Sequence, residues 1–140
     1  MKTKFLKFKY TKNPRTLLDK QEIQTYLWHL ENTSALDKLP LPFLVYYVVG
    51  CILTDEVNNG GFAQFLSNSS VKTLPYLEKC VKAINNSELI AICSKLISIV
   101  SDNFNIENLN SIAESEYSDE FEEVLSELDD RFYALDEKSD

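Results

Sequence analysis

Along most of the chain, apolar residues recur every three or four positions, which is the spacing of one face of a helix. The clearest case is residues 118–135. Ser118 stands where a helix N-cap is expected, and Asp119 and Glu120 follow at the positive end of the helix dipole. The segment predicts a terminal helix that packs on a core through one face. Its apolar stripe consists of Phe121, Val124, Leu125, Leu128, Phe132 and Leu135.

Weaker patterns predict helices in four other places. Residues 17–30 show helical spacing, and residues 62–68 are long enough for one short helix. Residues 41–55 are rich in Val and Tyr, which favour strands, but the length of this apolar run favours a buried helix. The polar stretch 101–116 has room for one more helix.

Capping residues delimit two further helices in the second half of the chain. Thr73 is expected to cap a helix that runs to about residue 85, with Pro75 tolerated in its first turn. Asn86 or Ser87 is expected to cap a helix over 88–100, which is apolar on most faces and is therefore expected to be central.

These elements predict an all-α fold with about five to seven helices. A chain of 140 residues suits one compact domain, and 3 Gly and 4 Pro provide few turns for a many-stranded β fold. We expect this helical domain to span residues 17–140. Residues 1–16, where Leu6, Phe8 and Tyr10 alternate with lysines, are expected to form an extended or disordered basic arm.

Charge is distributed unevenly along the chain, whose net charge is −8. Residues 1–40 carry eight Lys and Arg against four acids, whereas residues 114–140 carry twelve acids against two basic residues. So negative a surface repels phosphates, which argues against direct binding of nucleic acid or of an anionic membrane. A basic protein would be attracted. The positively charged arm is expected to dock on the acidic segment, within one chain or between two.

Residue types that carry chemistry are scarce. The three cysteines are odd in number and lack CxxC spacing, and the chain has one histidine, so we expect no metal, no cofactor and no disulfide framework. There is no Walker loop and no secretory signal, and the longest apolar run, 41–53, is too short to span a bilayer. The sequence therefore favours a cytoplasmic protein that is not an enzyme.

One segment, residues 55–70, combines two glycines with polar side chains and aromatics. Gly60 is expected to adopt the left-handed conformation that closes a helix, and Gly61 to admit a second backbone. Two interpretations stay open: a polar network that fixes a helix corner, and a pocket for a ligand or a hydrolytic reaction. The candidate residues are Glu56, Asn59, Gly60, Gly61, Gln64, Asn68 and Ser69.

This segment resembles the signature of the bacterial DNA-mimic protein family, most members of which are domains of unknown function. The resemblance covers about residues 40–100 well and 117–135 loosely, where Leu128-Asp129 and the aromatics that follow would correspond. Val71 departs from the pattern, because the family commonly has Gly there. The matching run reads Glu56-Val57-Asn58-Asn59-Gly60-Gly61-Phe62-Ala63-Gln64-Phe65 and closes with Asn68-Ser69-Ser70.

The resemblance implies a helical domain whose acidic surface imitates duplex DNA and occupies the DNA-binding face of a partner, such as a transcriptional regulator. The terminal helix suits that role, because its acids recur every three or four residues opposite the apolar stripe. An immunity or antitoxin-like protein that sequesters a basic toxin would use the same face, and a homodimer stays open. The candidate partner-binding residues are Glu116, Asp119, Glu120, Glu123, Glu127 and Asp130.

Overall fold

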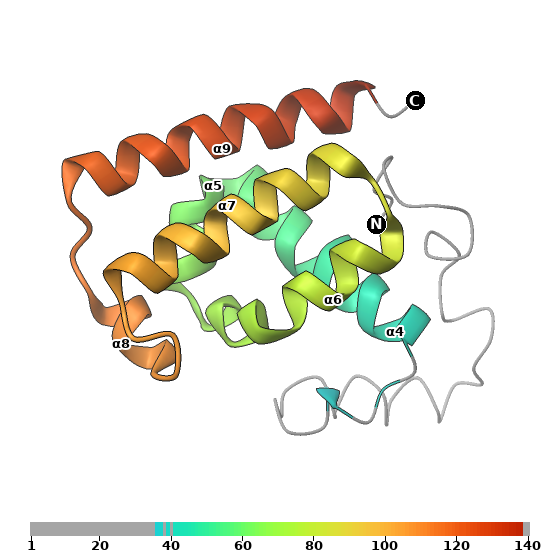
Figure 1. Cartoon of the computed structure of the whole chain (residues 1–140), viewed down its shortest axis with the longest axis horizontal. Helices are drawn as coiled ribbons and strands as arrows, with labels where there is room; N and C mark the ends of the chain where they lie inside the picture. Colours follow the sequence, from blue (N-terminus) through green and yellow to red (C-terminus); the bar gives the residue numbers. More distant parts are fainter. Residues whose placement is uncertain (1–35, 38, 40, 139–140) are drawn as a thin grey trace.

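The structure is a computed structural model that describes residues 36, 37, 39 and 41–138, and every regular element within them is a helix (Figure 1). The all-α prediction is therefore confirmed. The basic arm over 1–16 and the helix predicted over 17–30 lie outside the described residues. None of the described helices is both long enough and apolar enough to cross a membrane.

The helices follow one another with short connections. The first three are continuous, so the helix predicted over 41–55 is confirmed but extends further and is wound as a π-helix in its middle. Where π winding gives way to α, the Thr54 hydroxyl donates to the Val49 carbonyl at 2.7 Å. In order, the elements are α4 (Leu41–Val45), η2 (Tyr46–Leu53), α5 (Thr54–Ser67), η3 (Ser69–Thr73), α6 (Leu74–Ile84), α7 (Ser87–Asn103), α8 (Leu109–Glu114) and α9 (Asp119–Lys138).

Two of the predicted N-caps are confirmed. The Asn86 side chain accepts a hydrogen bond from the Leu89 N–H at 3.0 Å and so caps α7. The Ser118 hydroxyl accepts from the Phe121 N–H at 3.1 Å at the start of α9. Each cap satisfies an N–H group that has no partner within its own helix.

The start of α6 differs from the prediction. Thr73 does precede the helix, and Pro75 lies in the first turn, but Thr73 makes no side-chain cap. Its hydroxyl donates to the Ser70 carbonyl at 2.7 Å instead, because the 3₁₀ helix η3 leads directly into α6. At the other end of α6, Asn85 has a φ of 61°, the left-handed conformation that ends a helix.

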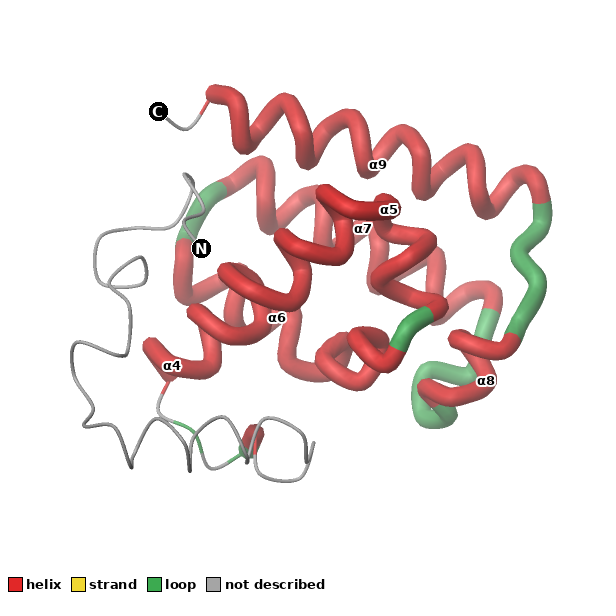
Figure 2. Tube along the Cα trace, turned by 180° about the vertical axis from the view of Figure 1, so that it is seen from behind, coloured by secondary structure: helices red, strands yellow, loops and turns green. Residues whose placement is uncertain are grey.

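Helix α9 lies across α5 and α7, and views from opposite sides agree on this arrangement (Figure 1; Figure 2). Its stripe is buried as predicted, with Val124 half-buried at the edge. The largest fully buried side chains are Phe62 and Phe65 of α5 and Phe132 of α9. Phe62 and Phe132 meet edge to face with ring centroids 5.9 Å apart, so the apolar core joins α9 directly to α5.

The glycine pair breaks α5 into two halves. Gly60 has φ −155° and ψ 19°, and Gly61 has φ 76° and ψ −177°, so neither has helical backbone. The prediction that Gly60 is the left-handed residue was wrong, since the positive φ belongs to Gly61. The backbone of Gly61 lies in a region that is essentially restricted to glycine.

Replacing Gly61 by Ala is therefore expected to lower the free energy of unfolding by about 1–3 kcal/mol, because alanine is strained at this φ and ψ. Urea unfolding followed by circular dichroism measures the change. Ser94→Ala, at an exposed position of α7, serves as the control and is expected to stay within about 0.5 kcal/mol of the wild type. Equal stability of the two variants would contradict the requirement for glycine at position 61.

Candidate functional site

Two features stand out once the fold is assembled: the contacts that α9 makes with the break in α5, and the outward face of α9. The first involves Asp129 and Tyr133, which lie one helical turn apart on α9 and which we call the Asp129–Tyr133 pair. Each makes a hydrogen bond to backbone of α5. The pair thus joins two segments that are more than sixty residues apart in sequence.

Asp129 acts as the N-cap of the second half of α5. Its Oδ1 accepts a hydrogen bond from the Phe62 N–H at 2.7 Å. That N–H follows the break and lacks a regular partner within the helix. A Cβ at Gly61 would overlap the Asp129 carboxylate, so glycine provides room for this side chain and not for the second backbone that the sequence predicted. Burial raises the pKa of Asp129, the Phe62 N–H opposes this shift, and the negative charge of Asp130 adds to it.

Tyr133 binds the first half of α5, on the other side of the break. Its hydroxyl donates to the Val57 carbonyl at 2.7 Å. Burial, followed by the charges of Asp129 and Asp130, raises the pKa of this hydroxyl, which keeps it protonated as a donor. The later residue of α9 thus meets the earlier residue of α5, so the two helices run antiparallel at this contact.

A second set of polar contacts lies along α5 itself. The Gln64 amide donates to Glu56 Oε2 at 2.9 Å, and the Asn68 amide donates to the same oxygen at 3.1 Å. The Gln64 side chain folds over Gly60, where a Cβ would overlap it. One carboxylate thus accepts two amides across the break, an arrangement typical of a polar network that fixes a helix corner.

The remaining candidates of this segment lie apart from the network. Asn59 and Ser69 are exposed, and their side chains make no hydrogen bond within the described part of the chain.

Among the described residues, no group of three His, Cys, Asp or Glu side chains gathers closely enough to hold a metal ion. Burial raises the pKa of Cys80 and of Cys93 to about 12, so both behave as apolar core residues.

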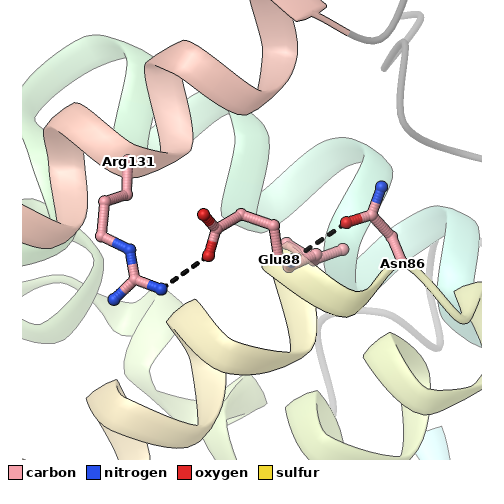
Figure 3. A network of polar contacts seen from close by, with 4 residues as sticks. Asn86, Glu88 and Arg131 are labelled. Atoms are coloured by element: carbon pink, nitrogen blue, oxygen red, sulfur yellow. Dashed lines mark hydrogen bonds and ion pairs between the residues drawn. The ribbon is translucent and has the colours of Figure 1, made fainter.

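The outward face of α9 carries five of the six candidate partner-binding acids, and the sixth, Glu116, precedes the helix. We call these six residues the acidic face. Every one of them is exposed. At the edge of α9 that faces α7, Arg131 forms an ion pair with Glu88 at 2.6 Å (Figure 3). Figure 3 also shows Asn86, which caps α7 beside Glu88. The acidic face consists of Glu116, Asp119, Glu120, Glu123, Glu127 and Asp130.

Sequence reasoning missed Asp129 and Tyr133 as site residues. Asp129 was grouped with the motif only through the resemblance, while its neighbour Asp130 was assigned to the acidic face. A signal was present, since both residues directly follow buried stripe positions, Leu128 and Phe132, at a spacing of four. Polar residues at the border of an apolar stripe are placed to reach a neighbouring helix.

Removing the Asp129 side chain is expected to destabilise the fold. Asp129→Ala leaves the Phe62 N–H without its acceptor and is expected to lower the free energy of unfolding by about 0.5–2 kcal/mol. Asp129→Asn keeps an acceptor oxygen and is expected to retain most of the stability. Asp130→Ala removes the exposed neighbouring charge and is the control, expected to change stability by less than about 0.5 kcal/mol.

The raised pKa of Asp129 predicts that the stabilities of the wild type and of Asp129→Asn depend differently on pH. Because burial raises the pKa of Asp129 above its ordinary 3.8, the native state holds this proton more tightly than the unfolded chain does. The contribution of Asp129 to stability therefore falls as pH rises from 3.8 to the native pKa, and it is constant above. We expect the stability difference between wild type and Asp129→Asn to decline over this window. Parallel pH profiles for the two proteins would contradict the raised pKa.

The Glu56 network is tested by Gln64→Ala, which removes one of the two amides that Glu56 accepts. We expect a loss of about 1 kcal/mol in the free energy of unfolding, the usual net contribution of one such hydrogen bond. Asn59→Ala is the matched control within the same motif and is expected to be close to neutral. A melting temperature unaltered by Gln64→Ala would instead favour a pocket lined by these residues.

The contacts at the break and the acidic face both lie within the part of the chain that matches a known family. Residues 37–140 match the family model described as DMP19-like protein. Searches of curated proteins and of solved structures found no significant match. Because the match covers more than half of the chain, the chain belongs to the DMP19-like protein family.

Proposed function

We propose that this protein is a DNA mimic that binds a basic protein, such as a transcriptional regulator, through the acidic face of α9. The observation that carries the proposal is the division of α9 into two faces. One face is buried in the core, and the other presents a row of exposed carboxylates. Membership of the DMP19-like family supports the same role.

The spacing of the carboxylates suits a surface that imitates phosphates. Neighbours three or four residues apart on a helix have Cβ atoms about 5–6 Å apart. From Asp119 to Asp130 the helix rises by about 16 Å, which is just under half of the roughly 34 Å turn of duplex DNA. A groove or cleft lined with Lys and Arg would thus meet several carboxylates along one line.

No ion pair among the described residues uses a charge of the acidic face. Within the described residues, ion pairs join Lys82 to Glu78 and Arg131 to Glu88, and neither includes a residue of the acidic face. An exposed single-sign row accelerates encounter with a basic partner, and this steering weakens as salt rises.

The partner is to be found by affinity capture from a bacterial lysate at low and high salt, followed by competition with duplex DNA. A DNA mimic and DNA occupy the same surface, so duplex DNA is expected to displace the captured partner. A partner that duplex DNA fails to displace would contradict mimicry and favour sequestration of a basic toxin.

Neutralising the acidic face tests the residues directly. The variant Glu120→Gln, Glu123→Gln and Glu127→Gln is expected to fold normally, because the substituted side chains are exposed and like charges at this spacing repel mildly. Its association rate with the partner is expected to fall steeply, and the salt dependence of that rate to flatten, because screening acts within about 8–10 Å. Stopped-flow or surface-based kinetics measure both.

The matched control removes three charges from exposed positions outside α9: Glu78→Gln, Asp102→Asn and Glu107→Gln. It has the same net charge as the test variant but an intact acidic face. We expect it to bind nearly as well as the wild type. Equal losses in the two variants would show that net charge alone governs binding and would contradict a role for α9.

A further inference from the structure

Within the described residues, two sets of directed contacts lie at separate positions along α9. Around its first turn, the rings of Phe104, Tyr117 and Phe121 cluster, with centroid distances of 5.3 Å for Phe104–Phe121 and 5.2 Å for Tyr117–Phe121. The Asp129–Tyr133 pair lies further along, starting about 12 Å from Phe121 at the rise of an α-helix. The cluster anchors one end of α9, and the pair anchors the half that carries Glu127 and Asp130.

Between these positions the contacts of α9 with the core are apolar. Burial of Leu125 and Leu128 stabilises the helix, but the hydrophobic effect that drives it is not directional. On the α7 side, the Arg131 and Glu88 side chains are 42% and 49% exposed, and an ion pair so exposed constrains little. Hydrogen bonds depend on angle as well as distance, so the Asp129–Tyr133 pair adds a directional constraint to the edge-to-face contact of Phe132 with Phe62.

Both α5 partners of the pair are backbone atoms on either side of the glycine break. The Val57 carbonyl and the Phe62 N–H are placed by the conformations of Gly60 and Gly61 rather than by rotatable side chains. The direction of α9 is therefore set relative to the backbone of α5 at the glycine break.

We propose that Asp129 and Tyr133 are positioning residues for partner recognition, which hold the second half of α9 so that its carboxylates stay in line with those of the first half. The proposal rests on the proposed function of the acidic face. Turning a helix of about 6 Å radius by about 30° moves a surface charge by about 3 Å. That displacement is similar to the axial spacing of phosphates on one DNA strand, about 3.4 Å.

The structural part of the test uses the double variant Asp129→Ala and Tyr133→Phe, which keeps the apolar stripe and the aromatic ring. Residual dipolar couplings measured by NMR report the direction of each segment of α9 relative to α7. We expect residues 119–124 to keep their wild-type couplings and residues 126–135 to depart from them. Wild-type couplings throughout α9 would overturn the proposal. Tyr133→Phe alone is measured in the same way if the double variant loses its helical circular dichroism.

The binding part compares a probe that senses charge with one that senses geometry. Decalysine is expected to bind the double variant within about twofold of the wild type, because every carboxylate of the acidic face is retained. The partner captured by the wild type and displaced by duplex DNA is expected to bind about tenfold more weakly. The double variant Asp129→Asn and Tyr133→Phe is expected to recover part of this loss, because Asn keeps the acceptor oxygen.

Equal losses for decalysine and for the partner would contradict positioning, since they would indicate a lost charge or a damaged fold. Failure of the proposed function has a different signature. If no partner is displaced by duplex DNA, mimicry fails, whereas the dipolar couplings still decide whether the pair sets the direction of α9.

Discussion

The hydrogen bond from the Phe62 N–H to the Asp129 carboxylate is the contact on which the arrangement of α5 and α9 depends. A break inside a helix leaves N–H and carbonyl groups without their regular partners, and burying them unpaired is costly. Asp129 accepts from the Phe62 N–H at the start of the second half of α5, and Tyr133 donates to the Val57 carbonyl near the end of the first half. Gly61 makes both the break and the approach of Asp129 sterically possible.

The hydrogen bond between Phe62 and Asp129 connects the glycine motif, which is the segment 55–70 around Gly60 and Gly61, to the acidic face. Gly60 and Gly61 lie in α5, whereas the acidic face belongs to α9 and the residue Glu116 before it. Because Asp129 and Tyr133 lie on the same helix as the carboxylates, a backbone conformation set at Gly61 determines how a remote charged row is presented. Three polar residues of the segment, Glu56, Gln64 and Asn68, bond to one another across the same break.

Much of this architecture follows from local patterns in the sequence. The stripe of α9 and the caps Asn86 and Ser118 were predicted because periodicity and capping depend on residues close together in the chain. The failures have physical causes. Two adjacent glycines do not reveal which of them takes the positive φ, and Thr73 bonds within η3 because a 3₁₀ helix precedes α6. The contact of Asp129 with Phe62 was out of reach, since only the packing of α9 on α5 brings the two together.

Hydrogen exchange at the Phe62 amide, followed by NMR, tests the central contact most directly. An N–H at the start of a helix exchanges readily unless a partner protects it. We predict that the Phe62 amide of the wild type is protected nearly as strongly as that of Leu96 in the buried part of α7. We predict further that Asp129→Ala removes the protection of Phe62 and leaves that of Leu96 largely intact. A Phe62 amide that exchanges at the rate of an unprotected peptide in the wild type would contradict both the contact and the structural role of the glycine motif.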